Sequence, residues 1–336
     1  MPLLRVAMAP LLFTVPGLGW EIQSYGFFMG LALVVGWVVS LALARADRLP
    51  ADSLGTVYVA SVAGGVLAAR AGWLVQHPDR WEGAGSLLSL SADGLAPFVG
   101  IVVALLLSTV MATLRKVPVT AWFDVIAPAF AVGTILERVG ALLAGSGYGR
   151  YAPDWPLSIR FPPGSAAYAD HLAHLEGLLA PGAESSLPVH PTQLYGAVLA
   201  AVGLWFALWL RKRRQFSGQV FLSYAMYVIV ARTFVEDWFR ADAVQPVLGP
   251  LNPGQVAGVA LLIALGIILR TRGRRAVRIE GGLRYWEGGR WSPGEPPPSA
   301  KGKPEAKAKS EPKPASKPAP RKSGPGKKKK KKKGKK

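Results

Sequence analysis

The sequence predicts an all-α, polytopic integral membrane protein with about seven transmembrane helices. Half of its 336 residues are hydrophobic and only 18% are charged, a balance too apolar for an ordinary water-soluble domain of this length. Apolar windows of about 20 residues, the length that crosses a hydrocarbon core roughly 30 Å thick, recur along the chain. We therefore expect a bundle of membrane-spanning helices that is followed by a basic tail.

The predicted spans together form a transmembrane domain over residues 22–275. The second, fourth and sixth spans contain charged residues, and the fourth contains Pro128, which can bend a helix. The seven spans are 22–44, 54–76, 95–114, 119–145, 191–210, 219–239 and 254–269.

Lys and Arg are concentrated in alternate connections between the spans. They follow the first, third, fifth and seventh spans, as in Arg45 and Arg48 after the first and Arg115 and Lys116 after the third. Because short connections rich in Lys and Arg stay in the cytoplasm, the N-terminus is predicted outside and the C-terminus inside.

The N-terminal residues 1–21 contain Arg5 and a short apolar stretch, as a signal peptide does. Pro10 and Pro16 interrupt this stretch, and no convincing cleavage site of small residues follows it. We interpret residues 1–21 as an uncleaved interfacial segment, with a signal peptide as the alternative.

Most of the positive charge lies at the C-terminal end. The net charge is +20, and residues 301–336 hold 17 Lys and Arg against Glu305 and Glu311, which places +15 there. We interpret 276–336 as a cytoplasmic tail, of low complexity and disordered from about residue 292. It either attracts anionic lipids of the inner leaflet or is a solvated segment without a dedicated partner; no nucleic acid is expected, because no structured module accompanies the lysines.

The connection 146–189 is long and contains six prolines, so it is expected to be an external loop that is either functional or disordered. A short amphipathic helix is predicted around His171 and His174. These two histidines and His77 are expected to be exposed to solvent. Cysteine is absent, which excludes disulfides, thiolate metal sites and a cysteine nucleophile in this chain.

Polar side chains within the spans lie at one depth. An ionised side chain in hydrocarbon costs at least roughly 2.5–3.5 kcal/mol, so such residues normally face a protein interior or a water-filled cavity. In the predicted orientation they all fall in the outer half of the membrane: Tyr25, Arg70, Arg138, Gln193 and Arg232.

The spacing of Arg232, Glu236 and Arg240 places them on one face of the sixth span. Guanidinium groups bind phosphate oxygens in pairs, so a cavity lined by Arg138 and Arg232 suits a phospholipid headgroup. The alternative is that Glu137 or Glu236 forms a buried ion pair with an arginine and only holds helices together.

Motifs on several spans resemble those of the prolipoprotein diacylglyceryl transferase family, over about residues 25–269. The stretch ERVGALLAGSGYGR is similar to the family's GRIGNFINGELWGR, which maps an essential arginine to Arg138 and a later glycine to Gly149. The stretch RTFVEDWFRADA resembles RFIVEFFREPDA, which maps a conserved arginine and glutamate to Arg232 and Glu236.

Shorter matches extend the resemblance. HPTQLYG resembles the family's HPSQLYE around His190 and Gln193, and YG, AARAGW and PGQ resemble family motifs at Tyr25, Arg70 and 253–255. The chain also departs from the family at positions that lose hydrogen-bonding groups. A family histidine is replaced by Phe98, and further polar residues of the motifs are replaced by Ala141, Ala144, Ser146 and Gly196.

The resemblance implies transfer of the diacylglyceryl group of phosphatidylglycerol to the lipobox cysteine thiol of prolipoproteins, the first step of lipoprotein maturation in the bacterial inner membrane. It implies that His190 replaces the missing base or, alternatively, caps the fifth span. Arg138 and Arg232 are expected to hold the phosphate and Glu236 to orient an arginine. The residues expected to bind the lipid are Tyr25, Arg70, Arg138, Gly149, Gln193 and Arg232.

No metal or organic cofactor is implied. The expected partners are phosphatidylglycerol and prolipoprotein signal peptides, and we expect a monomer. The alternative function is that of a relative without catalysis that binds a phospholipid or a lipoprotein, and a transporter unrelated to lipids is a third.

Overall fold

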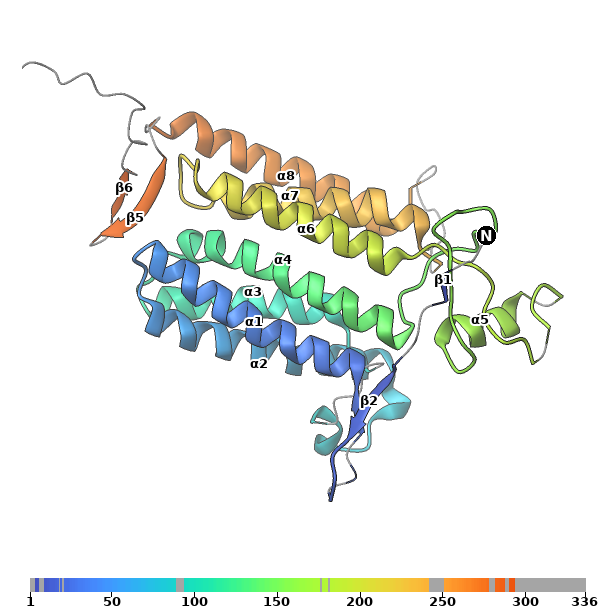
Figure 1. Cartoon of the computed structure of the whole chain (residues 1–336). Helices are drawn as coiled ribbons and strands as arrows, with labels where there is room; N and C mark the ends of the chain where they lie inside the picture. Colours follow the sequence, from blue (N-terminus) through green and yellow to red (C-terminus); the bar gives the residue numbers. More distant parts are fainter. Residues whose placement is uncertain are drawn as a thin grey trace, which may run out of the picture. The chain divides into compact units, whose positions relative to one another are not determined.

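A computed structural model of the chain shows a helical bundle (Figure 1). It describes residues 4–5, 9–17, 19, 21–88, 94–175, 177–180, 182–241, 251–277, 282–287 and 290–293. The basic low-complexity segment predicted from about residue 292 lies outside the described residues beyond residue 293.

Among the residues that the structure describes, six helices are long and apolar enough to cross a membrane, which confirms the prediction of a polytopic all-α protein. They coincide with six of the seven predicted spans. They are α1 Ser24–Ala46, α2 Ala51–Gln76, α3 Pro97–Leu114, α4 Val119–Ala144, α6 Thr192–Arg211 and α8 Pro253–Arg275.

The remaining predicted span, 219–239, is helical but is not one α-helix. Its first half is α7, Gln219–Ile229, and the chain continues as a π-helical turn, Val230–Val235, and a 3-10 turn, Glu236–Phe239. A π turn inserts one extra residue into the helical ladder and is frequent at functional sites. Hydropathy does not predict where an α-helix gives way to a π turn, because the π turn depends on hydrogen-bond geometry and not on composition.

The first four helices form two similar helical hairpins, α1–α2 and α3–α4. The boundaries of α4 lie 68 residues after those of α2, at 119 against 51 and at 144 against 76. The turns before these helices also match, because Arg48 and Lys116 adopt φ of 58° and 56° and each precedes an apolar residue and a proline. Since α1 packs on α4 and α2 packs on α3, the two hairpins meet in an arrangement with approximate twofold symmetry.

This internal repeat was not recognised in the sequence, because most side chains differ between the copies. It places Arg70 and Arg138 at the same position of their respective hairpins, two residues before Gly72 and Gly140. The two arginines therefore share a depth for a reason that is independent of a common site.

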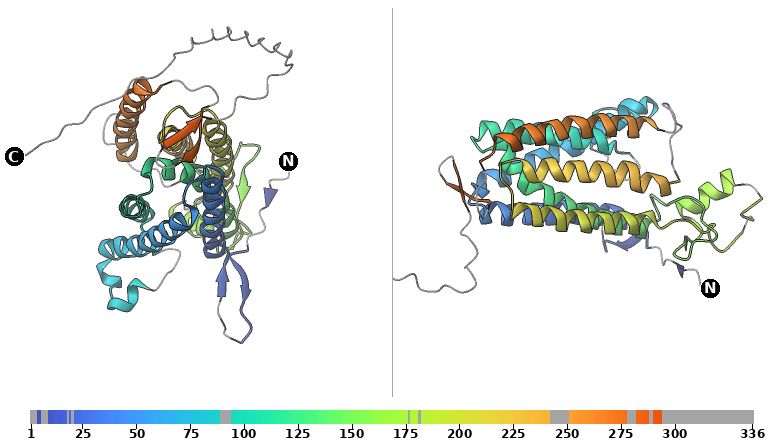
Figure 2. Two further views of the ribbon diagram at one scale, coloured as in Figure 1. Left: turned by 90° about the vertical axis from the view of Figure 1, so that its left-hand side faces the viewer. Right: turned by 90° about the horizontal axis from the view of Figure 1, so that it is seen from above.

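Short strands lie at both ends of the bundle. In the predicted interfacial segment, β1 Leu4–Arg5 pairs with β4 Ile159–Arg160, and β2 Leu11–Thr14 pairs with β3 Glu21–Gln23. Within the predicted tail, β5 Leu283–Glu287 and β6 Arg290–Pro293 form an antiparallel hairpin that the sequence analysis missed. This hairpin lies at one end of the helices and α5, Ala166–His174, lies at the other (Figures 1 and 2).

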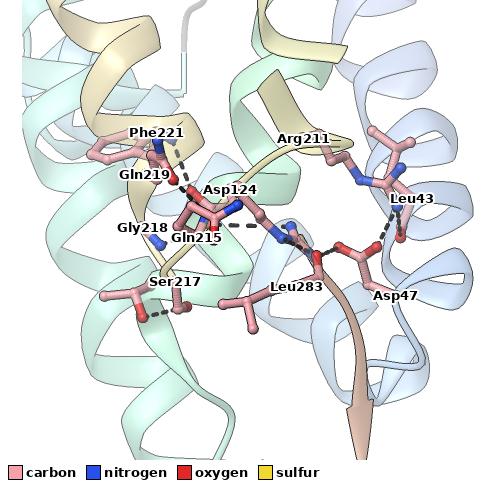
Figure 3. Close-up of polar contacts among 12 residues, drawn as sticks. Leu43, Asp47, Asp124, Arg211, Gln215, Ser217, Gly218, Gln219, Phe221 and Leu283 are labelled. Carbon is pink, nitrogen blue, oxygen red and sulfur yellow. Dashed lines mark hydrogen bonds and ion pairs between the residues drawn. The ribbon is translucent and has the colours of Figure 1, made fainter. Parts of the chain in front are cut away.

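A buried ionic network ties helices together at the hairpin end (Figure 3). Asp47, which follows α1, accepts hydrogen bonds from Arg211 Nη2 at 2.5 Å and from Arg214 Nη2 at 2.7 Å. Asp124 of α4 accepts hydrogen bonds from the backbone N–H groups of Gly218 and Phe221 and so stabilises the start of α7. Two carboxylates thus balance two guanidinium groups in a buried setting.

The β5–β6 hairpin covers this network. Arg214 Nε donates to the carbonyl of Leu283 at 3.1 Å, and Trp291 stacks over the Arg214 guanidinium at 4.2 Å. The backbone N–H of Trp286 donates to the carbonyl of Asp47 at 2.8 Å. The strands β5 and β6 are therefore part of the folded domain.

The external loop is folded around α5. Its small core contains Ile159, Phe161 and Val189, and a second cluster forms around Tyr168. His171 is buried at 3% exposure, so the expectation that it is exposed is wrong, whereas His77 and His174 are exposed. His171 Nδ1 accepts a hydrogen bond from the backbone N–H of Leu187 at 3.2 Å, which joins α5 to the end of the loop.

Replacement of Asp47 by asparagine is expected to destabilise the fold by about 3 kcal/mol, because it removes the carboxylate that pairs with both Arg211 and the buried Arg214 and leaves only Asp124, 4.0 Å from Arg214 Nη1, to balance them. The free energy of unfolding, measured by SDS titration in mixed micelles, checks this. Glu287→Gln is the control, since it alters an exposed ion pair with Arg48 that is expected to contribute little. Equal effects of the two variants would contradict the importance of the network.

The external loop is expected to open more readily at acidic pH. Burial lowers the pKa of His171 below its usual value, with Asp170 opposing the effect, so the unfolded loop binds a proton more readily than the folded one. Stability is therefore lost as the pH falls below about 6.5. Limited proteolysis of the loop is expected to be faster at pH 5.5 than at pH 7.5, and His171→Gln is expected to remove the difference while His174→Gln keeps it. An unchanged pH dependence in His171→Gln would refute this role.

Candidate active site

Three arginines converge on the buried carboxylate of Glu236. This side chain is only 4% exposed and opens the 3-10 turn after α7. Arg138 Nη2 of α4 lies 3.0 Å from Glu236 Oε1, and Arg232 Nη1 lies 2.9 Å from the same oxygen. Arg240 Nη1 lies 3.8 Å from it. The predicted convergence of Arg138 and Arg232 is therefore present, and a protein carboxylate joins them.

A second carboxylate completes this arginine cluster, which we define as Glu137, Arg138, Arg232, Glu236 and Arg240. Glu137 Oε2 lies 3.3 Å from Arg138 Nε. Three guanidinium groups and two carboxylates leave a formal charge of +1. Within this group guanidinium groups outnumber carboxylates, an arrangement that attracts anions.

Helix packing brings Tyr25 of α1 to the cluster. A Cβ on Gly140 would lie 2.7 Å from the Cβ of Phe28 and 3.4 Å from the Cα of Tyr25, so α1 and α4 can approach closely only because residue 140 is glycine. Tyr25 lies within electrostatic reach of Glu137 and Arg138. Its hydroxyl is therefore close to the charges that a bound anion would meet.

The two central arginines differ in exposure. The side chain of Arg232 is 43% exposed, whereas that of Arg138 is 10% exposed. Arg138 Nη2 donates to Glu236, whereas Nε lies 3.3 Å from Glu137 Oε2 without a hydrogen bond, and Nη1 has no partner among the residues that the structure describes. Arg138 therefore keeps two N–H donors for a ligand, and Arg232 offers an accessible face.

Arg70 lies at the equivalent position of the first hairpin and binds main-chain oxygens there. Its Nε donates to the carbonyl of Ser86 and its Nη1 to the carbonyl of Gly94, both at 2.9 Å. The guanidinium also lies 4.9 Å from the ring of Trp73. Arg70 thus holds the connection between α2 and α3. The binding of Arg70 to a lipid stays a prediction.

Gln193 and Thr192 hold the glycine-rich turn after α4. Gln193 Nε2 donates to the carbonyl of Ser146 at 2.7 Å, and Thr192 Oγ1 donates to the carbonyl of Gly147 at 2.6 Å. Gly145 ends α4 with a left-handed φ of 68°. The predicted site residue Gln193 therefore shapes the loop next to Arg138.

Gly149 lies where three segments cross. Its backbone N–H donates to the carbonyl of His190, and the N–H of Arg150 donates to the carbonyl of Phe239 at 2.8 Å. A Cβ on Gly149 would lie 2.5 Å from the O of His190 and 2.6 Å from the O of Phe239. Only glycine permits this crossing, which fixes the loop against the turn that carries Glu236.

His190 lines an open hollow beside the cluster. The hollow has a volume of about 460 Å³ and is lined by Arg150, Tyr151, His190, Phe234, Val235, Trp238 and Phe239. His190 Nδ1 lies 3.2 Å from the hydroxyl of Tyr195, and its ring packs against Trp155 and Phe239. Burial, together with the charge of Arg150, lowers the pKa of His190 and so favours the neutral imidazole that can accept a proton.

The positions that depart from the family motifs do not add polar groups to the cluster. Phe98 is 79% exposed at the start of α3, and Ala141 is buried in α4. Sequence reasoning treated Gly196 of α6 only as a lost polar group and missed its close approach to the Arg138 guanidinium, and it missed the roles of Arg150 and Phe239 in the crossing. No sequence signal identified the last two, since both depend on backbone contacts between distant segments.

Within the described part of the chain, no cluster of three or more His, Cys, Asp or Glu side chains is placed to hold a metal ion.

Comparison with known proteins shows similarity over the whole transmembrane part. A family model described as prolipoprotein diacylglyceryl transferase matches residues 10–271. The phosphatidylglycerol--prolipoprotein diacylglyceryl transferase of Finegoldia magna is 24% identical over 77% of this chain and 94% of its own length. Proteins of the same name from Lysinibacillus sphaericus and Thermus thermophilus are also 24% identical, over 85% and 74% of this chain and 98% and 89% of their own lengths.

Replacement of Gly149 by alanine is expected to destabilise the protein by about 2 kcal/mol, because the added methyl group overpacks the crossing of three backbones. The free energy of unfolding in mixed micelles checks this. Gly85→Ala is the matched control, because a Cβ at Gly85 meets nothing within 4 Å. If both variants were equally stable, the crossing would tolerate a side chain and the account of Gly149 would be wrong.

Proposed function

The chain belongs to the prolipoprotein diacylglyceryl transferase family, and we propose that it transfers the diacylglyceryl group of phosphatidylglycerol to the lipobox cysteine of prolipoproteins. The observation that carries this proposal is the arginine cluster, with a formal charge of +1 and with Arg138 and Arg232 meeting at Glu236. A phosphodiester carries one negative charge, and guanidinium groups bind its oxygens in pairs.

The reaction increases the charge at the phosphate. The substrate sulfur forms a bond to the glyceryl carbon, and the bond between that carbon and the phosphate oxygen breaks with its electron pair. The products are a thioether and glycerol 1-phosphate, whose phosphate carries nearly one negative charge more than the phosphodiester did. Guanidinium donors already fixed in place stabilise this growing charge. Arg138 Nη1 and the exposed face of Arg232 supply the donors, and Glu236 holds both arginines in position.

His190 is the proposed acceptor of the thiol proton. It lines the hollow next to the turn of Glu236, and its lowered pKa keeps the ring neutral near pH 7. Because the nucleophile of such a transfer is the thiolate, a nearby neutral imidazole assists the attack. Tyr25 lies within electrostatic reach of Glu137 and Arg138 and is proposed to hydrogen-bond the lipid, with Gly149 and Gln193 shaping the loop after α4. Arg70 is proposed to act at the edge of the lipid site through the α2–α3 connection.

The protein is a multi-pass membrane protein, and we propose that it resides in the bacterial inner membrane with its N-terminus outside. The cluster, the hollow and the α5 loop lie at the end of the helices that this orientation places outside. Prolipoprotein signal peptides would thus meet the site from the extracytoplasmic side. A monomeric state, and attraction of the basic C-terminal segment to anionic lipids, are parts of the same proposal.

One observation favours a second function. Phe98, at the position of a family histidine, points away from the protein with 79% of its surface exposed. A relative that lost proton transfer but kept the arginine cluster would bind a phospholipid or a lipoprotein without reaction. The two functions differ in whether thioether is formed.

Expression in a strain depleted of its own transferase is expected to restore conversion of a model prolipoprotein to its thioether form. Arg138→Ala and Arg232→Ala are each expected to lower the initial rate by about 100-fold, because each removes a donor that stabilises the developing charge. The matched control is Arg80→Ala, which alters an exposed arginine, and its rate is expected to stay within about twofold of that of the native chain.

Persistent conversion by the Arg138 and Arg232 variants would contradict their roles. Absence of conversion by the correctly inserted native chain, combined with binding of phosphatidylglycerol to the purified protein, would establish the second function instead.

A further inference from the structure

Asp237 follows Glu236 in the 3-10 turn, but its side chain contacts a different helix. Its Oδ2 accepts a hydrogen bond from Asn252 Nδ2 at 2.6 Å and one from Gln255 Nε2 at 3.5 Å. Successive side chains of a 3-10 helix are about 120° apart. Glu236 can therefore pair with Arg138 of α4 while Asp237 binds the start of α8.

The two partners of Asp237 are the residues that cap α8. Asn252 Oδ1 accepts a hydrogen bond from the backbone N–H of Gln255 at 2.9 Å, and Gln255 Oε1 accepts one from the backbone N–H of Asn252 at 3.1 Å. This reciprocal pair is a capping box. Each of the two side chains thus uses its oxygen for α8 and its NH2 group for the turn that carries Glu236.

Gln255 also binds the π turn. Its Nε2 donates to the carbonyl of Thr233 at 3.4 Å, and carbonyls near the end of a helical segment need donors from outside that segment. A Cβ on Gly258, about one turn further along α8, would lie 3.2 Å from Cγ2 of Thr233. The start of α8 therefore packs closely against the turn from which Arg232 reaches Glu236.

Hydrogen bonds have a large share in joining α8 to this turn. Gly258 is the only buried residue among the 23 residues of α8, all of which the structure describes. The helix exposes most of its surface, as expected where lipid is the solvent. A carboxylate at the N-terminus of a helix is in addition favoured by the helix dipole, so the Asp237 contact is well placed to hold the two segments together.

We propose that Asp237 is a positioning residue. By anchoring the 3-10 turn to the cap of α8, it holds the Glu236 carboxylate, and through it the guanidinium groups of Arg138 and Arg232, in the geometry that receives the lipid phosphate. Donors that stabilise a developing charge lose much of their effect when they are misplaced by about 1 Å. This inference rests on the proposed transfer activity and deepens it, since it assigns a role to a side chain outside the arginine cluster.

The variant Asn252→Asp separates the cap of α8 from the anchor. Aspartate caps a helix as well as asparagine does, so α8 keeps its N-terminal cap. The new side chain has no NH2 group, however, and places a second carboxylate against Asp237. The kcat of transfer, measured per folded protein, is expected to fall by about tenfold, because the turn that carries Glu236 loses its anchor.

Reversal of donor and acceptor tests the anchor directly. When Asn252→Asp is combined with Asp237→Asn, the new amide at position 237 donates to the new carboxylate at position 252, and kcat is expected to return to within about threefold of the native value. Asp237→Asn alone keeps an amide oxygen that can accept from Asn252, so it is expected to lower kcat by less than about threefold. The matched control is Gln76→Glu, which makes the same change from amide to acid at the exposed end of α2 and is expected to leave kcat unchanged.

A spin label reports the position of the turn without activity. Because the chain has no cysteine, a label can be attached through a single variant, Val235→Cys on the π turn or Val139→Cys on α4, at positions that are both exposed. Asn252→Asp is expected to increase the mobility of the label at 235, and the double change at 237 and 252 is expected to restore it. The label at 139 is expected to keep its spectrum in all variants.

A kcat for Asn252→Asp equal to that of Gln76→Glu would overturn the proposal, and so would a double variant no more active than Asn252→Asp. An unchanged label at 235 would also overturn it, because the contact would then hold α8 without positioning the turn. If the native chain lacked transfer activity, the proposed function would fail, and the label at 235 would still decide whether Asp237 anchors the turn.

Discussion

The structure of the site depends on one buried carboxylate, that of Glu236. A lone carboxylate among apolar helices would be strongly unfavourable, and so would lone guanidinium groups in the same place. Arg138 from α4 and Arg232 from the π turn both pair with the Glu236 carboxylate, so the buried charges of opposite sign compensate one another. The result joins two segments that are far apart in the sequence. It also gathers three guanidinium groups at one place, an arrangement that suits an anionic lipid headgroup.

The surrounding backbone keeps this cluster in place. The exit of α4, the entry of α6 and the end of the 3-10 turn cross at Gly149, so the elements that carry Arg138, His190 and Glu236 are fixed to one another by main-chain hydrogen bonds. At the opposite end, Asp47 and Arg214 join the helices beneath the β5–β6 hairpin. The helices between these two ends expose their apolar sides, as expected of a bundle whose solvent is lipid.

Hydropathy predicted six helices with nearly their observed boundaries, because span length and apolarity follow directly from the thickness of the bilayer. The spacing of Arg232 and Glu236 predicted that they face each other, and a shared depth in the membrane predicted that Arg138 lies near Arg232. Depth fixes the height of a residue in the bundle but not the neighbouring helix, so it did not reveal that Arg70 binds the carbonyls of Ser86 and Gly94. The π turn at 230–235, the burial of His171 and the β5–β6 hairpin depend on contacts between distant segments, which one sequence does not reveal.

The central claim is that Arg138 and Arg232 together receive the phosphate of the lipid. An experimental structure of the protein in a bilayer that contains phosphatidylglycerol tests it most directly, through the position of the lipid phosphate. The account predicts a phosphate within hydrogen-bond distance of Arg138 Nη1 and of the Arg232 guanidinium, with Glu236 still between the two side chains. A lipid phosphate bound elsewhere, with Arg138 and Arg232 contacting only Glu137 and Glu236, would contradict it.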